Sequence, residues 1–258
     1  MKRVLYCITA ALMTVAVACA YEKRETPVEP VDLEFWEVAD GEMSSRIMSF
    51  LYDGEADRLV VEAGVEGVTS TTPVSDILLT EYDYVGYTER IYTMPVGGIY
   101  IAAVDRANVE KFDEYMKLPN VQAAFSELTG GSIRLAWSYK NTCDELGDGT
   151  YTLYALKGRD GLNPALDGSG IISAEANAGM WGGYEVLIVM NDESAHLWAN
   201  LTGTNIGKPI AIVVNGKVYS APYVQARIEG GKLSIGGDFT QEEAEEFARA
   251  IMAKEKTE

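Results

Sequence analysis

Short apolar runs and alternating runs follow one another along the chain, separated by helix-type patterns. A two-residue period is typical of a half-buried strand, and a short unbroken apolar run is typical of a buried one. These patterns predict strands at 33–38, 59–61, 98–104, 133–137, 151–156, 171–176, 184–190 and 209–214. With helices between them, the strands predict an α+β fold of antiparallel-rich sheets with helices on one face.

The predicted helices begin at capping residues. Asp40 precedes apolar positions at i, i+4, i+7 and i+8, and Asp105 precedes a helix that reaches about residue 118. Thr240 and Glu243 have the spacing of a capping box before the last helix, whose apolar positions repeat every 3.6 residues.

Glycine pairs mark the predicted turns. Asn215-Gly216 between two apolar runs predicts a hairpin. Gly230-Gly231 predicts a second hairpin that joins strands at 223–228 and 232–235. The stretch 158–170 is rich in Gly, Asp, Asn and Pro, and we interpret it as the boundary between two segments.

The N-terminus has the pattern of a secretory signal. Lys2 and Arg3 precede an uncharged run over 4–20 that ends in small residues. At 17 residues this run is shorter than the ~20 that a membrane-spanning helix needs, so a retained anchor is the second interpretation. The charged, proline-containing stretch 19–32 is interpreted as a tether.

The end of the leader resembles a bacterial lipobox. Ala16-Val17-Ala18 stands before Cys19, so the resemblance implies a signal peptide over 1–18 and lipid attachment at Cys19. Ordinary cleavage after Ala18 or before Tyr21 is the alternative. With Cys19 carrying lipid, Cys143 has no partner for an internal disulfide.

Charge and composition exclude several classes of function. The chain has 21 basic and 39 acidic side chains and a formal charge of −18. A nucleic-acid binder or a polybasic membrane-surface protein needs the opposite sign. One histidine removes most histidine-based metal sites.

No pattern of catalytic residues stands out. Acidic side chains in the first turns of the last helix complement the helix dipole, and His196, four residues after Asp192, has no nucleophile motif beside it. CxxC, HExxH, phosphate-loop and calcium-loop patterns are absent from the sequence. We therefore expect a protein without catalysis, metal or cofactor; a hydrolase with an Asp/Glu pair is the less favoured alternative.

Four aromatic residues are candidates for a binding surface. Trp181 lies in a glycine-flanked stretch, and Tyr184, Tyr219 and Tyr223 lie near predicted strand ends. Exposed rings on a rigid sheet suit the capture of an extended polypeptide or a protein partner by stacking and edge pairing. The alternative is that the rings belong to the core.

The second segment resembles a known family. Residues 199–222, 228–231 and 237–244 are similar to the pattern LTxxNIGxxxAIVxxGxVxSxP, a glycine turn and GxFTxEEA of the first large periplasmic domain of SecD in the SecDF export machinery. Residues 33–37 resemble the opening of that domain, and 153–157 resemble its central strand.

The resemblance implies a SecD-type domain with a base over 33–157 and a head over 158–253, followed by a tail at 254–258. It further implies an envelope protein, on the periplasmic side or as an outer-membrane lipoprotein, that binds exported polypeptide or Sec and envelope proteins. The family's transmembrane helices have no counterpart in this sequence, so we expect no proton-driven motor. An adaptor lipoprotein unrelated to export and a relic that has lost its task are the other interpretations.

Overall fold

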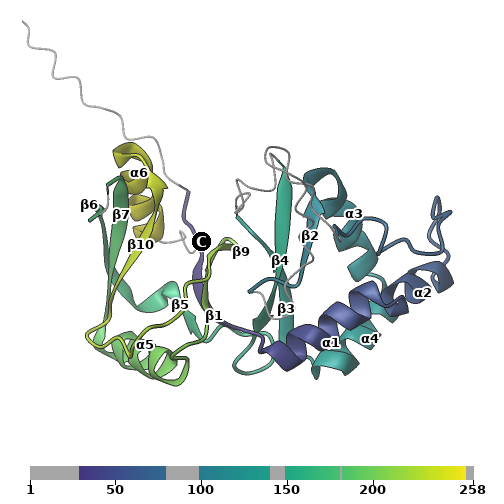
Figure 1. The fold of residues 1–258 in the computed structure, drawn as a ribbon. Helices are drawn as coiled ribbons and strands as arrows, with labels where there is room; N and C mark the ends of the chain where they lie inside the picture. Colours follow the sequence, from purple (N-terminus) through teal and green to yellow (C-terminus); the bar gives the residue numbers. More distant parts are fainter. Residues whose placement is uncertain (1–28, 80–98, 140–148, 181, 254–258) are drawn as a thin grey trace, which may run out of the picture.

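The structure is a computed structural model that describes residues 29–79, 99–139, 149–180 and 182–253. It confirms an α+β fold, and all pairings between its named strands are antiparallel. Two lobes lie side by side, with helices α1 to α4 in one, helices α5 and α6 in the other, and strands between them (Figure 1).

A seven-stranded sheet runs through the middle of the molecule. Its main path is β2-β4-β1-β8-β9, with β3 paired to β4 and β5 paired to β1. The strands are β1 (Leu33–Val38), β2 (Ala102–Asp105), β3 (Ile133–Trp137), β4 (Thr150–Lys157), β5 (Leu166–Asp167), β8 (Ile210–Val214) and β9 (Lys217–Ser220). The β1–β8 pairing joins the expected base and head segments across residue 157.

Five of these strands close into a ring. β4 pairs with β1, β1 with β8, and β8 with β9. β3 pairs with β4, and the residue after it, Ser138, bridges to Val218 of β9. The Tyr139 N–H donates to the Val218 carbonyl at 2.7 Å and fixes this closure. The result is a small barrel around its own apolar centre.

The barrel centre is built around Trp36. This side chain is fully buried among residues from all five strands, and its indole N–H donates to Glu34 at 3.0 Å. The Arg134 guanidinium lies 5.4 Å from the Trp36 ring centroid and contacts Glu34 at 3.2 Å. Phe35, on the other face of β1, packs into the second core described below, so one strand serves two cores.

The first core lies between the sheet and four helices. These are α1 (Gly41–Tyr52), α2 (Glu55–Glu62), α3 (Arg106–Met116) and α4 (Pro119–Thr129). α1 begins where predicted, because the Asp40 carboxylate accepts from the Met43 N–H at 2.9 Å. Asp57 is buried and accepts from the N–H groups of Val74 and Ser75, which ties the segment after α2 to the core.

The second core lies under a three-stranded sheet. Its order is β10-β7-β6, and its strands are β6 (Ile171–Ala178), β7 (Tyr184–Met190) and β10 (Lys232–Phe239). Helix α6 (Gln241–Met252) packs on one face of this sheet, and α5 (Asp192–Thr204) lies below it (Figure 1). The capping box of Thr240 and Glu243 is present as predicted.

Two predicted strands are wrong. Residues 59–61 belong to helix α2, in which Ala56, Leu59 and Val60 are buried while Val61 is 44% exposed. That i, i+3, i+4 pattern is helical, and the short Leu-Val-Val run concealed it. Residues 223–228 form only isolated bridges, from Tyr223 and Val224, because β10 pairs with β7 instead.

The Asn215-Gly216 hairpin is confirmed between β8 and β9. Both residues have the positive φ values, 49° and 77°, that the tight turn needs. The Asn215 side chain also accepts from the Asp32 N–H at 2.8 Å, so the turn holds the chain just before β1.

Candidate functional site

Four aromatic rings meet where β9 approaches α6. Tyr219 of β9 stacks on Phe239 at the end of β10, with 5.8 Å between centroids and 6° between planes. Phe247 of α6 packs on both, with centroids 5.9 Å from Tyr219 and 5.7 Å from Phe239. Tyr139, which follows β3, lies 5.8 Å from Tyr219 and is 41% exposed. We call these four residues the aromatic cluster.

The aromatic cluster forms part of the wall of an open groove of about 630 Å³. Val31, Val214 and Ala250 add apolar surface, and Glu29, Glu243 and Glu246 add carboxylates. Among the described residues, no Lys or Arg lines the groove. An apolar wall beside carboxylates suits a chain segment that carries apolar and basic side chains.

Local sequence features hold the cluster in place. Gly237 leaves room for Tyr219, since a Cβ at this position would lie only 2.6 Å from the Tyr219 hydroxyl oxygen. The capping box fixes the start of α6, because Glu243 accepts from the Thr240 N–H at 2.9 Å. The Val31 N–H donates to the Ala250 carbonyl at 3.1 Å, so the chain before β1 is tied to the same helix.

The structure brings two of the predicted surface residues into one neighbourhood. Tyr219 belongs to the aromatic cluster, and Tyr184 pairs across the sheet with Phe239. The Tyr184 hydroxyl donates to Gln241 at the start of α6 at 3.0 Å. Both tyrosines are half-buried against the second core, so they combine core packing with a surface-facing side.

The other candidates are placed differently. Tyr223, which follows β9, is 48% exposed and forms an isolated bridge to Pro209, and it is not among the residues that line the groove. Trp181 and the lipid-attachment candidate Cys19 lie outside the described residues, as does Cys143.

Sequence reasoning missed three members of the cluster. Phe247 is part of the amphipathic face of α6, Phe239 belongs to the GxFTxEEA motif, and Tyr139 follows a strand without any motif of its own. The only available signal was that Phe239 directly precedes the capping box and Phe247 follows Glu243 by four residues, which places both rings near the first two turns of α6.

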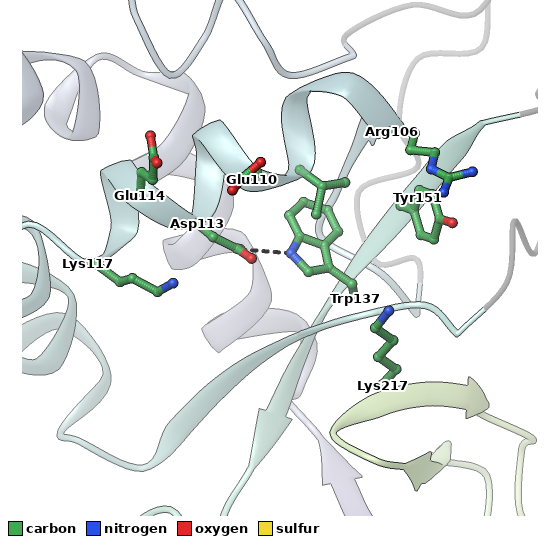
Figure 2. A pocket seen from close by; sticks show the side chains of 9 residues that line it. Arg106, Glu110, Asp113, Glu114, Lys117, Trp137, Tyr151 and Lys217 are labelled. Carbon is green, nitrogen blue, oxygen red and sulfur yellow. Dashed lines mark hydrogen bonds between the residues drawn. The ribbon is translucent and has the colours of Figure 1, made fainter.

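A second hollow, of about 470 Å³, lies beside α3. Its central feature is Trp137, which is 9% exposed and whose indole N–H donates to Asp113 at 2.8 Å (Figure 2). Phe112 meets the Trp137 ring edge to face at 5.3 Å on the core side. Asp113 thus serves to satisfy a nearly buried indole.

The charges around this second hollow compensate one another. Its lining contains three cations and three carboxylates: Arg106, Lys117, Lys217, Glu110, Asp113 and Glu114 (Figure 2). Such a balanced set selects neither an anion nor a cation. The groove with its aromatic cluster is therefore the stronger candidate surface.

Among the described residues elsewhere, the side chains that could act in catalysis or bind a metal do not form a site. His196 and Asp192 are both exposed on α5, and no hydrogen bond joins their side chains. Within the described ranges, no three His, Cys, Asp or Glu side chains gather as metal ligands would. In the same ranges, no helix is both long and apolar enough to cross a membrane.

Comparison with known proteins shows which proteins this chain resembles. The sequence model of the SecDF P1 head subdomain matches residues 148–254, a range that includes β4 and all later elements. The SecD translocase subunit of Sebaldella termitidis is 43% identical over 88 residues, which cover 34% of this chain and 22% of that protein. The subunit of Rhodothermus marinus is 33% identical over 159 residues, covering 61% of this chain and 24% of that protein.

This chain is similar to a SecD-type periplasmic domain, and its residues 148–254 match the head subdomain. It spans about a quarter of the length of these SecD relatives. A solved structure described as a membrane component SecDF that enhances protein export is 21% identical, with 85% of this chain and 92% of that chain covered and a TM-score of 0.34. The SecD-type match includes three of the four aromatic residues of the cluster, Tyr219, Phe239 and Phe247.

Proposed function

We propose that this SecD-type domain binds extended polypeptide in the cell envelope as part of protein export, without catalysis. The observation that carries the proposal is the aromatic cluster beside Glu29, Glu243 and Glu246 in an open groove. Stacked rings bind many apolar side chains without a fixed sequence, as a protein that meets many exported chains requires. The relatives are named translocase subunits, which supports the export context.

The carboxylates around the groove indicate which kind of polypeptide segment would bind best. The protein carries a formal charge of −18, and three of its carboxylates line the groove together with the rings. Opposite charges steer association and are weakened by salt. We therefore propose that basic and apolar segments bind best, and that their affinity falls as ionic strength rises.

Phe247→Ala is the test of the groove. The probe is reduced, carbamidomethylated lysozyme, a basic secreted protein that stays unfolded in this form. We expect its affinity to fall about tenfold, since removal of a central aromatic residue from a binding surface costs about 1–2 kcal/mol. The measurement is fluorescence anisotropy of the labelled probe at two salt concentrations.

Phe125→Ala is the matched control. Phe125 is also a half-buried ring on a helix, in the first core, with its centroid 5.9 Å from that of Phe50. Both variants remove a half-buried ring of the same size, so both are expected to lose about 1–3 kcal/mol of stability. Equal weakening of probe binding by the two variants would show a general effect of stability and would refute the groove.

Attachment to the membrane through a lipid on Cys19 is a further part of the proposal. It is supported by the lipobox-like residues before Cys19. The expected result is that Cys19→Ala moves the protein from the membrane pellet to the supernatant. Unchanged sedimentation would contradict the lipid anchor.

A further inference from the structure

The described sheet edges differ in what covers them. At β2, the Leu79 N–H donates to the Ala103 carbonyl at 2.9 Å, so the segment after α2 lies along that edge. At β9, Tyr139 donates to Val218, which closes the barrel. The edges at β2 and β9 are thus covered by the chain itself, which opposes pairing with another chain there.

The three-stranded sheet has one interrupted edge and one regular edge. The outer strand β10 carries a bulge between Gly236 and Phe239 and a lysine at 232, features that oppose pairing with another strand. The opposite strand β6 keeps an unbroken register with β7 from Ser173 to Ala178. In the described part of the chain, no backbone hydrogen bond links these six residues to any element other than β7.

The side chains of β6 leave this edge accessible. Residues 173–178 read Ser-Ala-Glu-Ala-Asn-Ala, with no proline, lysine or bulky residue. In an antiparallel strand every second residue directs its N–H and C=O away from the existing partner. Small side chains let another backbone approach to the ~4.8 Å spacing of paired strands. The edge therefore presents a row of donors and acceptors that an extended backbone matches.

We propose that the outer edge of β6, residues 173–178, binds an extended polypeptide segment as an additional strand. Ala174 and Ala176 face the second core but are only half-buried, and α6 packs on the same face. An added strand would place every second side chain beside α6, where it would cover these alanines. On the same face of the sheet, strand β10 carries Phe239 of the aromatic cluster, which packs on Phe247 of α6.

Charge selects the occupant of this edge. Glu175 is exposed on the outer face, and Glu185 lies on the same face of the neighbouring strand β7. A second copy of this chain would bring its own Glu175 and its charge of −18 against them. A segment that alternates apolar residues toward α6 with basic residues toward Glu175 fits both faces. The inference deepens the proposed polypeptide binding and rests on it, but it concerns a different surface from the groove.

The test uses a labelled decapeptide of alternating valine and lysine. The full chain is expected to bind it, and amide hydrogen exchange is expected to slow at residues 173–178. Glu175→Lys should weaken binding about fivefold, since it turns a cross-strand attraction into a repulsion. Glu185→Lys is the matched control, because it changes the charge equally on the same face of the central strand; we expect less than about a twofold loss.

Several results would overturn the inference. These are equal weakening by the two lysine variants, slowed exchange elsewhere with none in β6, or unchanged affinity for a decapeptide with two central prolines, which cannot complete a strand. A dimer of the protein alone that Glu175→Lys abolishes would assign the edge to a second copy.

The groove variant separates this inference from the proposed function. If Phe247→Ala abolishes decapeptide binding and Glu175→Lys leaves it unchanged, the groove holds the chain and the edge inference fails. If only Glu175→Lys weakens binding of both probes, the edge inference stands and the groove fails. Thermal unfolding of each variant verifies that it is folded.

Discussion

In the first core, Phe112 and Trp137 meet edge to face at 5.3 Å, and both rings are buried with the indole N–H paired to Asp113. In the second core, Tyr219, Phe239 and Phe247 stack at similar distances but line an open groove. The same ring chemistry thus completes one core and forms a surface on the other. Ring contacts alone do not distinguish packing from binding; burial and the surrounding charges do.

The difference follows from what covers each core. Four helices enclose the first core against the sheet, whereas α6 covers only one face of the three-stranded sheet and leaves β6 at an edge (Figure 1). Strand β1 directs Phe35 into the second core and Trp36 into the barrel centre, so this strand joins the second core to the barrel. The enclosed lobe therefore provides stability, and the open lobe provides the candidate surfaces.

Trp36→Ala probes the strand that joins the barrel centre to the second core, and it has the largest expected effect. Removing a fully buried indole from the barrel should cost about 3–5 kcal/mol of unfolding free energy. Because β1 contributes to the second core and to the barrel centre, whose strands β3 and β4 also contribute to the first core, we expect one urea transition, shifted as a whole. A loss below about 1 kcal/mol, or two transitions of which only one moves, would show that the lobes unfold independently.

Gly237→Ala probes the open lobe and has an intermediate effect. The new Cβ would lie 2.6 Å from the Tyr219 hydroxyl oxygen, so the ring must move, at a cost of about 1–2 kcal/mol. We expect a changed near-ultraviolet circular dichroism signal and weaker binding of the unfolded probe. At the neighbouring Gly236 a Cβ would meet nothing within 4 Å, so Gly236→Ala is the control. Identical spectra for the two variants would contradict the close approach to Tyr219.

Tyr52→Phe probes the enclosed lobe and has the smallest effect at neutral pH. Burial, with a contribution from Tyr100, raises the pKa of Tyr52 to about 12, and its hydroxyl has no hydrogen-bond partner among the described residues. Its removal should change stability by less than about 1 kcal/mol at pH 7.

The effect of this substitution should depend on pH. The pKa of Tyr52 is higher in the folded state than the unfolded value of 10.0. The resulting contribution to stability is present in full below pH 10 and is lost as the pH rises toward 12. Tyr52→Phe should therefore lose less stability than the wild type between pH 10 and 12, measured by urea midpoints. Tyr223→Phe, at an exposed position, is the control; parallel curves for wild type and Tyr52→Phe would contradict the burial of the hydroxyl.

Local signals predicted much of the fold. Asp40, the Thr240–Glu243 capping box and the Asn215-Gly216 turn lie where predicted, because each depends on hydrogen bonds or backbone angles within a few residues. The predictions at 59–61 and 223–228 failed. The first depended on which neighbours bury Leu59 and Val60, and the second on which strand is available to β10.

The candidate site was predictable only in part. Tyr184 and Tyr219 were named from their places near strand ends, and both lie beside Phe239 in the fold. Tyr139 and Phe247 could not be assigned to the same cluster, since they come from elements more than a hundred residues apart along the chain. Both rings reach Tyr219 only because the barrel closes through Val218 and α6 packs against the second core.

The sequence by itself determined the α+β class, most helix starts, the main hairpin and the resemblance to SecD-type domains, because these depend on local periodicity and short motifs. The tertiary structure alone decided that β1 joins two cores, that five strands close into a barrel, and that four distant rings line one groove. In the part of the chain that the structure describes, it also decided which sheet edges are covered and that the edge at β6 stays open. Such features depend on pairings between remote segments, whose partners are fixed only when the whole chain folds.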